Sequence, residues 1–216
     1  MNVAGRYVGQ SVLRTEDLRL LTGRGRFVAD VSFAGEVHAA FVRSPYPHAR
    51  VGAIDATAAR ALPGVVAVLT AADLEPATRP LQVPGHDATF GPLAAGRVLH
   101  VGDPVALVVA ESRYVAEDAL PLVEVEYELL PAVASAERAL DRGTPPLVEG
   151  MESNVVFRAT TSLGDVEGAF AAADRVVRAS FGQQRYANVP LEGRAGIAAH
   201  DVAAGELTYT ASTQNP

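Results

Sequence analysis

The chain contains no cysteine among its 216 residues. Without thiols it cannot form disulfides, ligate iron–sulfur clusters or hold zinc through thiolates. Any redox centre that works with this chain must be held by oxygen or nitrogen ligands, or must be supplied by another part of an assembly. We therefore do not expect the chain to transfer electrons by itself.

Long apolar runs are also missing. The longest uninterrupted one, Val105 to Ala110, is far shorter than the roughly 20 residues needed to cross a bilayer as a helix. The first residues, MNVAGRYVGQSVLR, hold no apolar stretch of signal-peptide length. From these two observations we expect a cytoplasmic location and no membrane partner.

Basic residues are fewer than acidic ones. The chain has 18 Lys and Arg and 25 Asp and Glu, which gives a net charge of −7. A partner with a phosphate backbone needs a basic surface, so no nucleic-acid partner is expected. The 49% of hydrophobic residues is enough for a substantial core, and the length suits one to two domains.

The first two thirds of the chain alternate between strand and helix patterns, which predicts an α/β (α+β) fold with a mixed sheet and helices. Helices are expected after the capping residues Thr70 and Ser112 and at Ser135 to Leu140. The stretch from Glu75 to Gly96 holds four prolines and three glycines and is interpreted as a long surface loop that contacts a partner. Strands are predicted at residues 36–43, 50–55, 65–70, 98–101, 104–111 and 123–128.

The last third predicts a second, β-rich unit. Pro, Gly and polar residues mark a linker at 142–154, a helix is expected at 165–173, and strands are expected at 175–183, 195–200 and 206–211. So few elements leave an open sheet edge, so this unit is expected to be incomplete. The division is an N-terminal segment at 1–17, a first domain at 18–135, a linker at 136–154 and the start of a second domain at 155–216.

Few residues suggest chemistry by themselves. The five histidines lack the spacing of metal ligands, and the run Gly23 to Arg26 is better explained as a turn than as an anion-binding loop. The proline-rich segment Ser44 to Arg50 predicts a rigid turn that could present His48 or Arg50 to a partner, although a structural role is favoured.

Two further groups lie near the end of the chain. Glu192 and Arg194 fall on a predicted turn and are expected to form a surface or interface ion pair. Polar residues from Ser212 to Pro216 follow the last predicted strand, a place where binding residues are often displayed.

Several stretches together resemble the large subunit of the xanthine dehydrogenase, aldehyde oxidase and aerobic carbon monoxide dehydrogenase family. They are RSPYPHARVGAID (43–55), ALPGVVAVLTAADL (61–74), VGDPVALVVAESRYVAEDAL (101–120), VEVEYELLPAV (123–133) and STQNP (212–216). The resemblance implies an α/β hammerhead domain, followed after the linker by the beginning of a molybdenum-cofactor-binding domain that is incomplete here.

The resemblance also implies a function. The chain would be the N-terminal part of a molybdenum hydroxylase large subunit, which oxidises aldehydes, N-heterocycles or similar small substrates with oxygen from water. By resemblance, the amide of Gln214 donates to an oxygen ligand of the molybdenum. This is the one site residue implied within the chain, since the family's glycine-rich loop and catalytic glutamate lie outside these residues.

The implied cofactor is a molybdenum–pterin, as molybdopterin cytosine dinucleotide. The implied partners are an iron–sulfur subunit and an FAD-binding subunit, in a dimer of heterotrimers. The piece alone is expected to bind no cofactor and to be inactive. Two alternatives stay open: the hydroxylase part just described, and a cofactor-free module that docks partner subunits. The carbon monoxide, aldehyde and purine branches are not distinguished.

Overall fold

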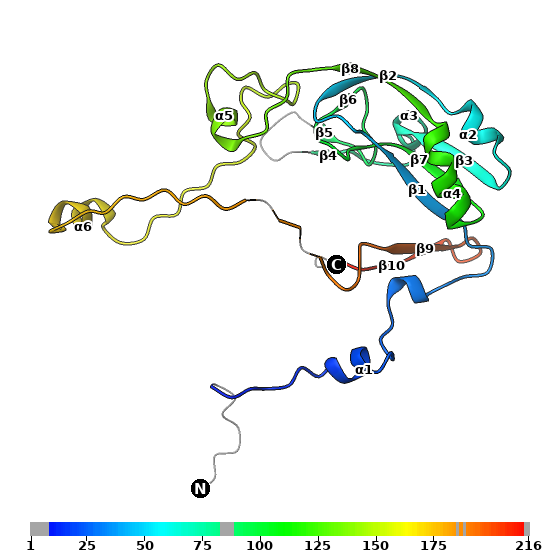
Figure 1. The fold of residues 1–216 in the computed structure, drawn as a ribbon, viewed down its shortest axis with the longest axis horizontal. Helices are drawn as coiled ribbons and strands as arrows, with labels where there is room; N and C mark the ends of the chain where they lie inside the picture. The colour runs from blue at the N-terminus through cyan, green and yellow to red at the C-terminus, as the bar shows by residue number, and fades with distance from the viewer. Residues whose placement is uncertain (1–8, 83–88, 185, 188, 214–216) are drawn as a thin grey trace, which may run out of the picture. The chain divides into compact units, whose positions relative to one another are not determined.

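A computed structural model describes residues 9–82, 89–184, 186–187 and 189–213 of the chain (Figure 1). The chain divides into two compact units. One is residues 36–177, and the other combines residues 1–35 with 178–216. Among the described residues, no helix is long and apolar enough to cross a membrane.

The centre of the 36–177 unit is strand β7 (Pro104–Ala110), which pairs along both edges. It is antiparallel to β1 (His38–Arg43) on one side and to β3 (Val65–Thr70) on the other. Four of its seven residues are buried. A strand that is paired at both edges and covered by other elements must be apolar almost throughout, which explains why this strand contains the longest apolar run of the sequence.

A second three-stranded sheet lies in the same unit. Strand β2 (Ala49–Asp55) is its middle strand, antiparallel to both β6 (Arg97–Val98) and β8 (Glu124–Leu129). The pairing register of β2 with β8 shifts between Val51 and Ile54, so the strand contains an irregularity of the kind that bends a sheet. The bend falls at Gly52 and Ala53.

Short helices cover the β1-β7-β3 sheet. Helix α4 (Arg113–Ala119) contacts β1 and β7, while α2 (Thr57–Ala61) contacts β3 and the 3-10 turn η2 (Leu120–Leu122) (Figure 1). The small side chains of α2 and α4 allow this close approach. The buried core cluster consists of Ala56, Ala59, Val68, Ala106, Val108, Ala119 and Val123.

Hydroxyl side chains cap two helices, and the sequence predicts the first of these caps. Ser112 accepts a hydrogen bond from the Val115 amide at the start of α4 (3.2 Å), and Ser135 accepts one from the Arg138 amide at the start of α5 (Ala136–Leu140) at 3.1 Å. These bonds satisfy amides that have no partner inside the helix.

Helix α3 (Ala71–Leu74) begins after Thr70, again as predicted. The carboxylate of Asp73 accepts hydrogen bonds from both the Thr70 amide and the Thr70 hydroxyl, each at 2.7 Å. These two bonds, the amide first, hold the pKa of Asp73 below its ordinary value because they stabilise the charged form.

The predicted loop from Glu75 to Gly96 holds more order than expected. Strands β4 (Leu81–Gln82) and β5 (Thr89–Phe90) pair antiparallel within it. Two-residue strands are too short to show a period of two in the sequence, which is why the composition of this stretch indicated only a loop.

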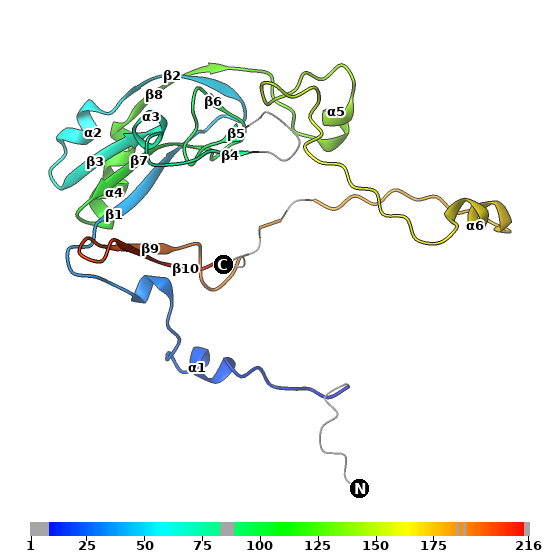
Figure 2. The ribbon, with the colours of Figure 1, turned by 180° about the vertical axis from the view of Figure 1, so that it is seen from behind.

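In the other unit, strands β9 (Gly196–Asp201) and β10 (Glu206–Ala211) form an antiparallel hairpin (Figure 2). The predicted strands at 195–200 and 206–211 are thereby confirmed. The N-terminal residues of this unit contain helix α1 (Asp17–Leu21) and the 3-10 turn η1 (Val28–Asp30).

The strand predicted at 98–101 is present only at Val98, in β6, and the one predicted at 175–183 is wrong. Residues 175–183 form no regular strand, and the exposed fractions of Val177 and Phe181 are 90% and 93%. Their β-favouring side chains find no sheet to pair with among the described residues, and propensity alone does not make a strand. The predicted helix before this run is present as α6 (Val166–Ala172), capped by the Asp165 carboxylate at 2.9 Å.

The buried face of β7 generates a stability prediction. Val108→Ala should lower the free energy of unfolding of the 36–177 unit by about 2 kcal/mol, because two buried methyl groups are lost and a cavity remains. Val66→Ala is the matched control, since the Val66 side chain on β3 is 58% exposed and its loss should cost well under about 1 kcal/mol. Urea titration of the chain, followed by circular dichroism, measures both; equal shifts of the two midpoints would contradict this account of the core.

A second prediction concerns acid. Because the folded-state pKa of Asp73 lies below its ordinary value, its carboxylate stabilises the fold above the unfolded-state pKa. That contribution disappears as the pH falls through the folded-state pKa. Thr70→Val removes one of the two donors, so the pKa of Asp73 should rise toward its ordinary value without reaching it.

The measurement is a titration of the Asp73 carboxyl carbon by NMR. Asp55 provides an internal reference, since bonds from Thr57 lower its pKa in the same way and the variant leaves them intact. An unchanged titration of Asp73, or an equal change at Asp55, would show that the Thr70 hydroxyl does not act on this carboxylate.

Candidate functional site

The end of β10 leads into the polar segment that the sequence singles out. Ser212, the first residue after the strand, makes three hydrogen bonds. Its Oγ donates to the Gly193 carbonyl at 2.9 Å and accepts from the Ala195 amide at 2.9 Å. Its own amide donates to the Ala195 carbonyl at 3.0 Å. The loop before β9 and the residue after β10 are thus joined by side-chain and backbone bonds.

Gln214, the predicted cofactor-binding residue, lies outside the described residues, as do Asn215 and Pro216. The structure therefore places the segment up to Thr213, and the role of Gln214 stays a prediction.

The turn that precedes β9 contains Glu192 and Arg194, but their predicted ion pair is wrong. In the described part of the chain no ion pair joins these two side chains. Glu192 instead accepts a hydrogen bond at 2.8 Å from the amide of Val28, 164 positions earlier. A partner so distant in the sequence leaves no local pattern. The opposite charges of Glu192 and Arg194, two positions apart, therefore suggested the wrong partner.

The run Gly23 to Arg26 is a turn, as favoured by the sequence. Gly23 adopts a φ of +69°, which glycine tolerates without strain, and its amide donates to the Leu20 carbonyl at 3.2 Å. Arg24 Nε donates to the hydroxyl of Thr22 at 3.1 Å. The turn ends helix α1.

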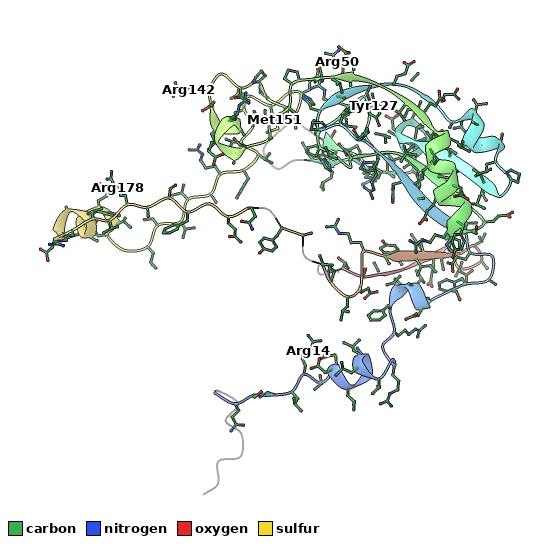
Figure 3. The ribbon with its side chains drawn as sticks, in the orientation of Figure 1. Arg14, Arg50, Tyr127, Arg142, Met151 and Arg178 are labelled. Carbon is green, nitrogen blue, oxygen red and sulfur yellow. The ribbon has the colours of Figure 1, made fainter. Side chains whose placement is uncertain are left out.

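The proline-rich segment from Ser44 is a tight turn at the start of β2. The Ser44 hydroxyl accepts from the Tyr46 amide at 3.0 Å and donates to the Tyr46 carbonyl at 2.9 Å. The Tyr46 ring packs edge-on against Tyr127 of β8, with centroids 5.2 Å apart (Tyr127 is labelled in Figure 3). Burial raises the pKa of the Tyr127 phenol, so this ring stays neutral at physiological pH.

The same turn does not present His48 to a partner, contrary to one of the sequence alternatives. The His48 side chain is only 6% exposed, and Nδ1 lies 2.6 Å from the carbonyl oxygen of Pro131. Arg50, by contrast, is exposed on β2 (Figure 3), with Nε 3.9 Å from a carboxylate oxygen of Glu128. The turn therefore has the structural role that its composition favoured.

The remaining histidines are scattered. His38 lies 3.7 Å from Glu36, His100 lies 3.6 Å from Asp103, and His200 is exposed on β9, while His86 falls outside the described residues. Among the described residues, no group of three or more His, Asp or Glu side chains could hold a metal ion.

A groove of about 700 Å³ lies in the 36–177 unit. It is lined by β2, the start of α3, the residues after β5 and the segment 147–149. Arg97 is held at its edge, where the guanidinium contacts the Leu147 carbonyl at 3.3 Å and the Glu149 carboxylate at 3.6 Å. Sequence reasoning missed this groove because its walls come from four separate stretches of chain.

Comparison with known proteins connects these features. The family model of the aldehyde oxidase and xanthine dehydrogenase a/b hammerhead domain matches residues 22–131. The model of the molybdopterin cofactor-binding domain matches residues 147–216. The chain belongs to the aldehyde oxidase and xanthine dehydrogenase family. The predicted hammerhead fold is confirmed with it.

Relatives in this family are molybdenum hydroxylase subunits. The chain is 42% identical to the nicotine 6-hydroxylase large subunit of Paenarthrobacter nicotinovorans, over 97% of this chain and 26% of that protein. It is 39% identical to the carbon monoxide dehydrogenase large chain of Afipia carboxidovorans, over 94% of this chain and 27% of that protein.

Among solved structures, quinoline 2-oxidoreductase from Pseudomonas putida 86 superposes with a TM-score of 0.82 and 42% identity, over 95% of this chain and 27% of that chain. The chain thus spans about a quarter of the length of these three relatives. The three relatives are named for different substrates, although their identities to this chain are similar.

The buried imidazole of His48 gives a testable consequence. A carbonyl oxygen can only accept, so the proton of the neutral ring must sit on Nδ1. Nε2 is buried and has no hydrogen-bond partner among the described residues. Nitrogen NMR should therefore show the Nδ1–H tautomer, and observation of the Nε2–H form would contradict the assignment.

Substitution tests the same bond energetically. His48→Ala leaves the Pro131 carbonyl without its donor and should lower the free energy of unfolding by about 1–3 kcal/mol. His48→Asn is the matched variant, because its side-chain amide can place a donor near the position of Nδ1. It should be the less destabilised of the two in urea titration, and the reverse order would show that ring packing rather than the hydrogen bond stabilises this turn.

Proposed function

We propose that this chain forms part of the molybdenum-cofactor-binding large subunit of a hydroxylase. The complete enzyme would oxidise aldehydes, N-heterocycles or similar small substrates and insert oxygen from water. The observation that carries the proposal is the match of residues 147–216 to the molybdopterin cofactor-binding domain, which includes the S-T-Q-N-P segment. The named activities of the aligned relatives support the reaction class.

The proposed cofactor is molybdopterin cytosine dinucleotide, which supplies the redox-active metal when bound. Thr213, Gln214 and Asn215 fit such a group, because hydroxyl and amide side chains donate hydrogen bonds to oxygen acceptors. The proposed role of Gln214 is to donate its amide N–H to an oxygen ligand of the metal. Strand β10 supports this role by ending next to the segment, at Ala211.

The proposed partners are an iron–sulfur subunit and an FAD-binding subunit, in a dimer of heterotrimers. A chain without cysteine cannot hold iron–sulfur clusters, so the electrons would have to leave through other polypeptides or other parts of the subunit. Relatives named as a large subunit and a large chain support such an assembly. A cytoplasmic location and the domain division at 18–135 and 155–216 belong to the same proposal.

The test is to purify the complete subunit that contains this chain, together with its co-expressed partner subunits, from a host that makes the cofactor. Molybdenum and released cytidine nucleotide should both be present in stoichiometric amounts. Turnover should be assayed with an aldehyde, an N-heterocycle and carbon monoxide, using isotopically labelled water to trace the inserted oxygen. Absence of molybdenum, nucleotide and all three activities would overturn the proposal in favour of a cofactor-free docking module.

Gln214 is tested in the same preparation. Gln214→Glu keeps the size of the side chain but removes the amide donor, and kcat should fall by about 10–100-fold, the usual effect of losing a bond to a metal ligand. Gln183→Ala is the control, since it removes an exposed glutamine amide elsewhere in the chain. Equal activities of the two variants would argue against the proposed contact.

A further inference from the structure

The hydrogen bond between Glu192 and Val28 connects the first part of the chain to the turn before β9. Glu192 Oε1 lies 2.8 Å from the Val28 nitrogen, and both residues are partly buried. A hydrogen bond to a charged acceptor is among the stronger kinds in proteins. Because Val28 and Glu192 are 164 positions apart, this bond brings together two segments that are distant in the sequence.

At the N-terminal end, the bond satisfies an amide that the local structure leaves free. Val28 is the first residue of turn η1, and the amides at the start of a helical turn have no partner inside it. The amide of the preceding residue, Phe27, is already taken by the Asp30 carboxylate at 2.9 Å. Glu192 supplies the acceptor for the next amide.

At the other end, Glu192 belongs to the turn that fixes Ser212. Its neighbour Gly193 accepts from the Ser212 hydroxyl, and Ala195 exchanges backbone and side-chain bonds with the same serine. Strand pairing adds the register of Gly196 with Ala211. A short series of bonds therefore runs from η1 through Glu192 to the residue two positions before Gln214.

We propose that Glu192 is a positioning residue, whose carboxylate ties the N-terminal turn to the Gly193–Ala195 loop and thereby fixes Ser212, the residue two positions before Gln214. The role of that segment rests on the proposed function, whereas the tie itself rests on bonds within this chain. The N-terminal turn η1 would thus stabilise the loop before β9 and the hairpin that follows it.

The absence of cysteine allows a direct test in the 216-residue chain. Nitroxide labels are attached through Ala29→Cys, at the exposed middle of η1, and Ala204→Cys, at the exposed tip of the β9–β10 hairpin. Dipolar EPR should give a narrow distance distribution for the otherwise unchanged chain. Glu192→Ala should broaden it, whereas Glu192→Gln should keep it narrow, because the amide oxygen of glutamine can still accept from Val28.

A second readout reports on the segment near Gln214. Hydrogen exchange of the Ala195 and Ser212 amides, measured by NMR, should be faster in Glu192→Ala than in Glu192→Gln or the unsubstituted chain. Glu206→Ala is the control, since it removes an exposed carboxylate from the same hairpin and should change neither readout.

Three results would overturn the proposal: a distance distribution unchanged by Glu192→Ala, a Glu192→Gln variant as broad as Glu192→Ala, or unchanged exchange at Ala195 and Ser212. Rescue by glutamine separates the hydrogen bond from a general effect of substitution at this position. Both readouts use no cofactor, so their failure would leave the proposed function standing. Conversely, a complete subunit without molybdenum would overturn the proposed function and leave the tie intact.

Discussion

The pairing of β7 along both of its edges is the constraint on which the 36–177 unit depends. A strand between two neighbours has all its backbone groups satisfied, but its side chains must then be accommodated on two faces. One face packs against alanines of α2 and α4, and Val105 on the other packs with Ala49 and Val98 of the second sheet. The two sheets are thus built around one strand, and the turn at Ser44 to His48 begins where that strand's neighbour β1 ends.

Sequence reasoning predicted this unit well because its signals are local. The apolar run of β7, the serines at 112 and 135 and the Thr70–Asp73 pair each act within a few residues, and the structure confirms the elements they mark. The strand expected at 175–183 failed for the opposite reason. Its valines and phenylalanine favour a strand, but a strand also needs a partner edge, which no local pattern specifies.

In the candidate site, too, local signals could be recognised in the sequence and a long-range contact could not. Polar residues after β10 could be recognised in the sequence, since a strand end followed by Ser, Thr, Gln and Asn is a typical place for binding groups. The carboxylate at 192 could not be assigned correctly, because its partner is a backbone amide, a group present at nearly every residue and therefore invisible as a pattern. Family membership adds what geometry within this chain does not, since residues 147–216 match the molybdopterin cofactor-binding domain.

Gly52 lies where strand β2 forms part of the wall of the groove in the 36–177 unit. A Cβ atom at this position would lie 3.2 Å from the Cβ of Glu126 on the adjacent strand and 3.3 Å from its carboxylate. The bend of β2 and the wall of the groove, to which Gly52 contributes, therefore coincide at a residue without a side chain. Any side chain at this position would have to push aside Glu126 or shift the backbone of β2, and a shift of β2 would move part of the groove wall.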